Sequence, residues 1–144
     1  MSKIIKTIEI GKNILMPIMG IGTWEMRDKT VLENVLDTGF AAGYRLIDTG
    51  YIYQNEDHIG SILKNLLPKH NIKRSDVFIT SKMPMSHHGG KVREAFSTSL
   101  SKLQSDHIDL YLVHFPGSSS VKPSDGERLK ELRRQTWAQM EKLY

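Results

Sequence analysis

The sequence predicts an α/β protein whose strands form a parallel sheet. Short apolar runs begin near residues 18, 45, 77 and 108, and a segment with helical hydrophobic spacing follows each of them. This alternation favours parallel strands joined by right-handed crossovers. The spacing of about 30 residues per strand–helix unit fits half of a (β/α)8 barrel, in which about 250 residues make eight units. A complete small open α/β sheet also fits 144 residues, and periodicity alone does not separate the two.

The chain is expected to begin with a β-hairpin. Apolar and polar residues alternate over residues 4–10, and after a turn that contains Gly11 the apolar run resumes at residues 14–16. Pro17 should end the pairing, because proline has no N–H to donate. Residues 18–22 are then predicted to form the first strand of the sheet.

The next two helices are predicted from their caps and their apolar faces. Asp28 can cap the first helix, which should bury Val31, Leu32, Val35, Leu36 and Phe40, with Gly39 near its end. A strand over residues 45–48 follows. The second helix has its apolar residues at i, i+3, i+4, i+7 and i+8, and Pro68 should stop it: Ile59, Ile62, Leu63, Leu66 and Leu67.

The second half repeats this order. A strand at residues 77–80 leads into Ser81 and Lys82, and after a Pro/His/Gly loop at 84–90 comes a helix with a third apolar face: Val92, Ala95, Phe96, Leu100 and Leu103. The strand at 108–113 runs into His114. Ser124 has capping-box spacing to Glu127, and the last helix has its own apolar positions: Leu129, Leu132, Thr136, Trp137, Met140 and Leu143.

Composition indicates a soluble globular protein, with 39% hydrophobic and 25% charged residues. There is no cysteine, which favours a reducing, cytoplasmic compartment. The first residues lack the apolar run of a secretory signal, and no run is long enough to span a bilayer. The net charge of +4 leaves room for an anionic ligand. Nucleic-acid binding is not expected, because the basic residues are scattered. The one cluster, Lys130, Arg133 and Arg134, fits the solvent-exposed face of a helix.

Ionisable or amphipathic residues follow every predicted strand of the sheet. They are Gly22-Thr23-Trp24, Asp48, Lys82 and His114, and Tyr53 lies in the loop after the second strand. Each alone has an ordinary structural explanation. In parallel α/β folds, however, the carboxyl ends of the strands meet on one side and form the site. The four strands are therefore predicted to bring these groups together.

The set suits proton transfer to a carbonyl oxygen. A phenol with an ordinary pKa of about 10 is a poor acid–base catalyst at neutral pH, but a nearby ammonium lowers that pKa, and a carboxylate can hold the ammonium in place. A histidine beside the phenol can donate a hydrogen bond to the substrate oxygen. No nucleophile is evident, and no metal site is expected, since the adjacent His87 and His88 in a glycine loop rarely suffice.

Residues 43–60 form the longest recognisable motif of the chain, which reads Gly-Tyr-Arg-Leu-Ile-Asp-Thr and continues through Tyr53 to Asn55-Glu56. This stretch closely resembles the signature of the aldo-keto reductase family. Further motifs of the family occur in order: Met16-Pro17, Gly20-Ile-Gly-Thr-Trp24, Ser81-Lys82, Leu112-Val-His-Phe-Pro116 and a terminal helix from Arg134 to Leu143. The resemblance covers essentially the whole chain.

The resemblance implies the N-terminal half of a (β/α)8 TIM barrel preceded by the hairpin, and an NADPH-dependent reduction of aldehydes or ketones. It makes Tyr53 the proton donor and Lys82 the group that lowers the pKa of its phenol, with Asp48 paired to Lys82. His114 would orient the carbonyl and Trp24 would line the substrate pocket. Gly22, Thr23 and Asp48 would contact the cofactor.

Two local departures from the family pattern are visible. Gly50 stands where the family usually has alanine or serine, a change expected to matter little, and Met83-Pro-Met replaces a segment that shapes the pocket in many members. The larger departure is length, because family members are roughly twice as long and take most of their cofactor contacts from later strands. The chain is therefore expected to be one domain, residues 1–144, truncated after the fourth unit, with open sheet edges.

Three functions fit the sequence. The first is a reductase of small carbonyl compounds, weakly active or inactive as this chain alone. The second is a non-catalytic half-barrel that pairs with itself or with a full-length relative. A cofactor-sensing module ranks lowest, because Asn55-Glu56 and Met16-Pro17 resemble the ordinary reductases.

Overall fold

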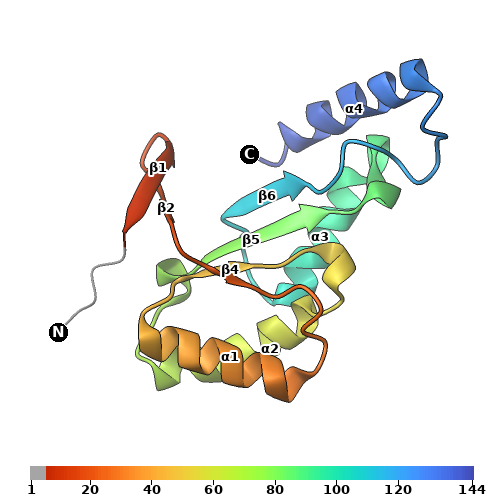
Figure 1. Cartoon of the computed structure of the whole chain (residues 1–144). Coiled ribbons are helices and arrows are strands. Elements are labelled where there is room, and N and C mark those ends of the chain that lie inside the picture. Colours follow the sequence, from red (N-terminus) through yellow and green to blue (C-terminus); the bar gives the residue numbers. More distant parts are fainter. Residues whose placement is uncertain (1–5) are drawn as a thin grey trace.

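The computed structural model describes residues 6–144, and it contains the predicted hairpin and a four-stranded parallel sheet (Figure 1). The hairpin consists of β1 (Thr7–Gly11) and β2 (Ile14–Pro17), and its predicted start at residue 4 lies outside the described residues. The sheet has the order β3-β4-β5-β6, with all neighbours parallel. These strands are β3 (Ile21–Gly22), β4 (Leu46–Asp48), β5 (Phe78–Met83) and β6 (Leu110–Val113).

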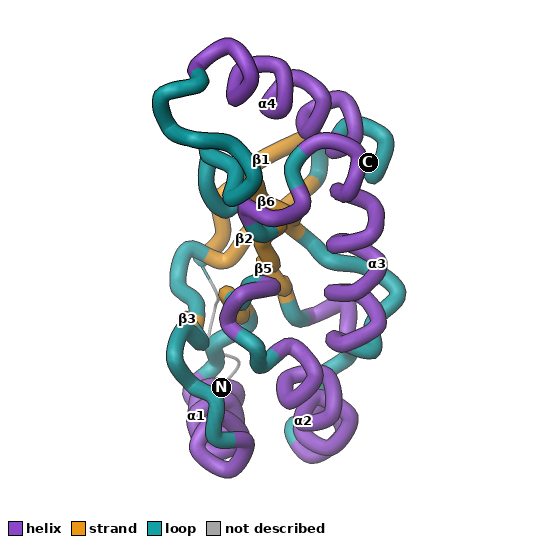
Figure 2. The backbone as a smooth tube through the Cα atoms, turned by 90° about the vertical axis from the view of Figure 1, so that its right-hand side faces the viewer, coloured by secondary structure: helices purple, strands orange, loops and turns teal. Residues whose placement is uncertain are grey.

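Four helices lie in an arc around one face of the sheet (Figure 2). They are α1 (Lys29–Ala42), α2 (Glu56–Lys69), α3 (Val92–Leu103) and α4 (Gly126–Met140), and α2 packs between α1 and α3. Ile47 and Ile79 are paired in register on neighbouring strands, and both are fully buried against the helices. One apolar cluster extends from these strands into α1, α2 and the end of α3 and includes Leu32, Leu36, Ile59, Ile62 and Leu103. The predicted alternation of strands and helices, and the partial barrel it implies, are confirmed.

The first strand of the sheet is shorter than predicted. Residues 18–22 were expected to form it, but only Ile21 and Gly22 pair with β4. The reason is that the N–H of Ile18 still donates to the carbonyl of Lys6, so this residue belongs to the hairpin. The chain crosses to the sheet edge at Gly20, where a Cβ would lie 2.2 Å from Leu46 Cδ2.

Helix α1 begins and ends at residues suited to its caps. The Asp28 carboxylate accepts hydrogen bonds from the N–H groups of Thr30 and Val31, as the N-cap prediction requires. The helix ends at Gly43, whose φ of 99° favours glycine. The prediction that Val31 faces the core was wrong, because its side chain is 53% exposed. Leu32, Leu36 and Phe40 form a stripe at i, i+4 and i+8, and Val31 lies beside it.

Other boundaries shift by a few residues. Helix α2 passes through Pro68 and ends at Lys69, where Asp37 of α1 accepts from the lysine ammonium at 2.7 Å. Strand β5 continues beyond residue 80, so that Lys82 is held by strand pairing with Leu112 and not by a loop. The loop at 84–90 contains two short 3-10 turns, Met85–His87 and Gly89–Lys91.

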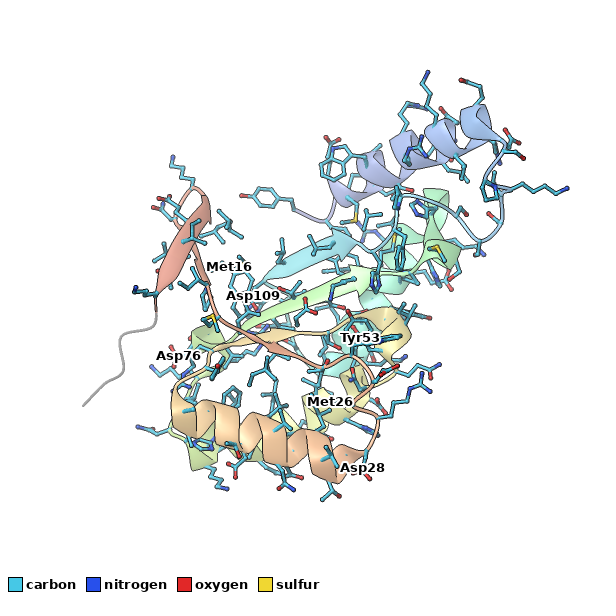
Figure 3. The ribbon with its side chains drawn as sticks, in the orientation of Figure 1. Met16, Met26, Asp28, Tyr53, Asp76 and Asp109 are labelled. Atoms are coloured by element: carbon cyan, nitrogen blue, oxygen red, sulfur yellow. The ribbon has the colours of Figure 1, made fainter. Side chains whose placement is uncertain are left out.

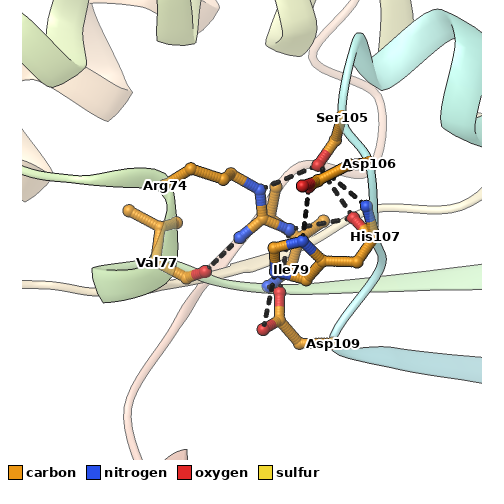
Figure 4. Close-up of polar contacts among 7 residues, drawn as sticks. All are labelled: Arg74, Val77, Ile79, Ser105, Asp106, His107 and Asp109. Carbon is orange, nitrogen blue, oxygen red and sulfur yellow. Dashed lines mark hydrogen bonds and ion pairs between the residues drawn. The ribbon is translucent and has the colours of Figure 1, made fainter.

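A polar cluster supplies one of the hydrogen bonds between β5 and the start of β6 (Figure 4). The carboxylate of Asp109 accepts from the N–H of Ile79 at 2.8 Å and from the guanidinium of Arg74 at 2.9 Å. The same guanidinium donates to Ser105 Oγ and to the carbonyl of His107. Because a side chain takes the place of the backbone acceptor, β6 begins at Leu110 and not at residue 108 as predicted. Asp76 and Asp109 lie at the opposite end of the strands from Tyr53 (Figure 3).

Helix α4 packs against α3 and against the turn Gly89–Lys91 that precedes α3. Its N-cap is Asp125, which accepts from the N–H of Arg128, so the predicted capping box between Ser124 and Glu127 was wrong. Leu132 and Thr136 are buried as expected, whereas Trp137 is exposed. None of the helices within residues 6–144 is long and apolar enough to cross a membrane.

Both end strands of the sheet lack a further neighbour within residues 6–144, which confirms the expected open edges. Beside β6 lies a groove of about 750 Å³ between this strand, the hairpin and α4. Its lining includes Ile14, Leu110, Leu112 and Met140. Leu112 is exposed on the face opposite to the helices.

Candidate active site

Three of the predicted catalytic residues meet at the carboxyl end of the sheet. The ammonium of Lys82 donates to Asp48 Oδ1 at 2.6 Å, to the carbonyl of Thr49 at 2.8 Å and to Tyr53 Oη at 3.0 Å. All three of its N–H groups are therefore used. Within residues 6–144 the structure shows no acceptor for the proton of the Tyr53 phenol. The phenol can thus accept from lysine and still donate its own proton outward.

The sheet register explains why these groups meet. Asp48 is the last residue of β4 and pairs with Thr80 of β5, two residues before Lys82. Side chains alternate between the two faces of a strand, so Asp48, Thr80 and Lys82 share the face opposite to the helices. The N–H of Thr49 donates to the Thr80 carbonyl, which continues the pairing into the loop. Tyr53 follows in a short 3-10 turn and points back toward this face (Figure 3).

His114 lies beside the phenol at the end of β6. Its backbone N–H donates to the Met83 carbonyl. Its ring meets that of Tyr53 edge-on, with the ring centroids 5.7 Å apart. Burial, and then the positive charge of Lys82, lower the pKa of the imidazole. Its Nδ1 is buried and has no hydrogen-bond partner within the described residues. The ring is therefore neutral near pH 7, with one N–H to donate.

Trp24 covers the other side of the phenol. Its ring lies edge-on to that of Tyr53 with the centroids 4.8 Å apart, and 51% of the side chain is exposed. The preceding residue, Thr23, is fully buried, and both its N–H and its hydroxyl donate to the carbonyl of Asp48 at 3.0 Å. The loop after β3 is thus fastened directly to the residue that holds Lys82.

Two glycines border the site. Gly22 pairs with Asp48, and a Cβ built on it would meet no atom within 4 Å, so the space in front of it is open. At Gly50 a Cβ would lie 3.4 Å from both Lys82 Cβ and Tyr53 Cε1, which is ordinary van der Waals contact. The structure therefore brings every predicted site residue to one end of the sheet, and Gly50 leaves room for a Cβ atom.

Sequence reasoning missed two buried polar residues behind the site. The side chain of Asn55 bonds to the loop that carries Trp24, although its place before α2 had suggested only the start of a helix. Glu56 is buried and accepts from Ser81 Oγ at 2.6 Å and from Ser99 Oγ at 3.1 Å, and burial raises its pKa. The sequence signal for the second was its spacing, because Glu56 lies three residues before Ile59 and so falls on the apolar face of α2.

The two histidines of the glycine loop are both engaged. His88 is buried, with Nδ1 bonded to Thr136 Oγ1 and Nε2 bonded to the Phe115 carbonyl, while His87 bonds to its neighbour Ser86. A group of three or more His, Cys, Asp or Glu side chains that could hold a metal is not found within residues 6–144.

Comparisons with known proteins point to one family. The model of the aldo/keto reductase family matches residues 18–144. An aldose reductase of Encephalitozoon cuniculi is 43% identical over 113 residues, which cover 78% of this chain and 37% of that protein. An NAD(P)H-dependent D-xylose reductase of Candida tenuis is 37% identical, over 81% of this chain and 36% of its own length.

Solved structures of the same family superpose on the chain. A crystal structure of an aldo/keto reductase from Brucella melitensis superposes with a TM-score of 0.79 at 33% identity, over 97% of this chain and 49% of that one. A Bombyx mori aldo-keto reductase in complex with NADP superposes with a TM-score of 0.74 at 31% identity, over 84% of this chain and 41% of that one. The chain thus spans less than half the length of these relatives, and it belongs to the aldo/keto reductase family.

Proposed function

We propose that the site at the carboxyl end of the sheet reduces the carbonyl group of a small aldehyde or ketone with NADPH. One observation carries the proposal: Lys82 Nζ lies between the Asp48 carboxylate at 2.6 Å and the Tyr53 phenol oxygen at 3.0 Å. A phenol that accepts from an ammonium and keeps its proton free is arranged to protonate an oxygen that becomes negatively charged. The family relationship and the reductases among the relatives support this reading.

Each residue has a role that follows from its contacts. Tyr53 donates its proton to the carbonyl oxygen, and the ammonium of Lys82 stabilises the phenolate that remains. Asp48 fixes the lysine and balances its charge. His114, neutral because burial lowers its pKa, donates its N–H to the same oxygen and orients the carbonyl. Trp24 forms the half-exposed wall against which the rest of the substrate packs.

The residues present fit one end of the cofactor. Gly22 faces open space, and Asp48 keeps a partly exposed carboxylate beside it, so both can approach the nicotinamide ribose. When bound, NADPH supplies the hydride for the carbonyl carbon. Thr23 holds the carboxyl ends of β3 and β4 together at this point through its two bonds to the Asp48 carbonyl.

The chain alone is proposed to turn over slowly. It spans 37% of the aldose reductase that it resembles, so it supplies only part of the surface that surrounds a cofactor in such a relative. A loosely held cofactor loses the near-attack geometry that hydride transfer needs. The test is to incubate the purified chain with NADPH and a reactive aromatic aldehyde and to follow the loss of nicotinamide absorbance.

A second function is favoured by the open edge at β6. The groove of about 750 Å³ and the exposed Leu112 are suited to receive another strand and helix, such as those of a second copy of the half-barrel. Sedimentation of the purified chain tests this. A concentration-dependent dimer that Leu112→Lys dissociates supports pairing, and a well-folded monomer at all concentrations argues against it.

A further inference from the structure

The loop that carries Trp24 is a tight turn held in an unfavourable conformation. The N–H of Met26 donates to the carbonyl of Thr23 at 3.1 Å, which closes a turn with Trp24 and Glu25 at its centre. Glu25 has a φ of 64°, a left-handed conformation that costs energy for any residue with a side chain. Such a turn persists only when its surroundings hold it.

The side chain of Asn55 contacts both ends of this turn. Its Nδ2 donates to the carbonyl of Thr23 at 2.8 Å and to the carbonyl of Met26 at 3.1 Å. Its Oδ1 accepts from Thr49 Oγ1 at 2.9 Å, which fixes the orientation of the amide. The residue is 0% exposed, so no water competes for these bonds.

The position of Asn55 in the chain makes this use unusual. It precedes α2 at the N-cap, where an asparagine side chain ordinarily accepts from the first N–H groups of the helix. Here it makes no such bond. Its hydrogen bonds instead join the loop after β3 to Thr49, which lies between Asp48 and Tyr53.

We propose that Asn55 is a positioning residue that fixes Trp24 against Tyr53, and thereby sets the width of the opening through which a carbonyl substrate reaches the phenol. The inference deepens the proposed function, because it is the proposed role of Trp24 that gives its position a consequence for substrate choice. The structural part is independent of catalysis: without the two amide donors, the strained turn relaxes and the indole leaves the phenol ring.

The test uses the whole chain with Trp137→Phe, so that Trp24 is the remaining indole. Asn55→Asp keeps the size of the side chain and removes the donors. We expect the nuclear Overhauser contacts between the Trp24 and Tyr53 rings to be lost, and Trp24 fluorescence to shift to longer wavelength and to become more accessible to acrylamide. Thr136→Val is the matched control, since it removes hydrogen bonds of another buried side chain, in α4, and should leave these signals unchanged.

A folded Asn55→Asp variant with unchanged ring contacts and quenching overturns the inference, as does an equal change in the control. If Asn55→Asp does not fold, Thr49→Val decides, because it removes only the bond that orients the amide. The contacts between the Trp24 and Tyr53 rings must then weaken in Thr49→Val as well. None of these readouts needs turnover, so a chain without reductase activity still tests the inference, and the proposed function stands or falls separately on Tyr53→Phe. Where turnover is measurable, we expect Asn55→Asp to change the ratio of the KM values for a bulky and a small aldehyde. The corresponding ratio of the kcat values should change less.

Discussion

The ammonium of Lys82 lies 3.0 Å from the phenol oxygen of Tyr53 and 4.7 Å from the centre of its ring. The lysine is on β5 and the tyrosine follows β4, so the contact exists only because the two strands are parallel neighbours in register. Lysine is fixed from behind by Asp48 and the carbonyl of Thr49. Its position is therefore fixed by contacts within the protein itself.

The first prediction concerns Lys82→Met, which keeps the aliphatic part of the side chain and removes the charge. Turnover should fall by about 10²–10⁴, the usual contribution of a positioned proton-transfer group, because nothing then stabilises the phenolate. Steady-state kinetics with NADPH and a reactive aldehyde measure it. Lys91→Met, on an exposed turn, is the control and should keep the parent rate. Equal loss in both variants would contradict a specific role for Lys82.

The second prediction concerns Glu56, whose pKa burial raises. The folded state then binds its proton more tightly than the unfolded state, so this group favours folding below the unfolded pKa, and that contribution is lost as the pH rises through the folded pKa. Glu56→Gln should remove this dependence and gain in stability relative to the parent as the pH rises toward neutral. Urea unfolding at several pH values measures it, and parallel curves for the two proteins would refute it.

The third prediction concerns His114, whose pKa is lowered chiefly by burial and next by Lys82. Below the unfolded pKa of about 6.5 the unfolded chain binds a proton that the folded chain resists, so folding stability falls as the pH drops through this range. His114→Phe should flatten that part of the stability profile. His87→Phe, at a partly exposed turn, serves as the comparison, and an identical flattening there would show that His114 is not the cause.

The fourth prediction concerns the glycines. Gly50 has an extended backbone with φ −173°, and a Cβ there makes only ordinary contacts, so Gly50→Ala should raise the free energy of unfolding by about 0.4–1 kcal/mol. Gly89 has φ +77°, and a Cβ there would lie 3.2 Å from Leu132 Cδ2, so Gly89→Ala should lower it. Denaturant unfolding of the two variants should therefore give opposite signs.

The fifth prediction separates two positions of α1 that one hydrophobic pattern treated alike. Leu36 is fully buried in the main apolar cluster, so Leu36→Ala should cost about 2–5 kcal/mol. Val31 is 53% exposed, and Val31→Ala should change stability by about 0.5 kcal/mol at most. Similar losses in both variants would show that Val31 packs in the core after all.

The sequence allowed most of the fold to be predicted, because strands and helices alternate with clear periodicity. The end of each strand could be found from its apolar run, and with it Asp48, Lys82 and His114. Boundaries were less certain where a side chain takes over a backbone role. Asp109 replaces the first acceptor of β6, and Asp125 displaces Ser124 as the cap of α4. The spacing of hydrophobic residues does not show where a side chain replaces a backbone hydrogen-bond partner.

The parts of the site that escaped prediction are those whose partners are distant in sequence. Asn55 reaches Thr23 and Met26, about thirty positions earlier, and Glu56 reaches Ser81 and Ser99. A polar residue at a helix start has an ordinary local explanation, and only the three-dimensional arrangement shows that its side chain is turned away from the helix.

The proposed function depends on Tyr53, which protonates a carbonyl oxygen with the help of Lys82. The measurement that tests it most directly compares NADPH oxidation by the chain and by Tyr53→Phe in the presence of a reactive aromatic aldehyde. Oxidation should be slow, should depend on the aldehyde and should fall by about 10²–10⁴ in Tyr53→Phe. Equal rates in the two proteins, or no turnover together with no measurable binding of NADPH, would contradict it.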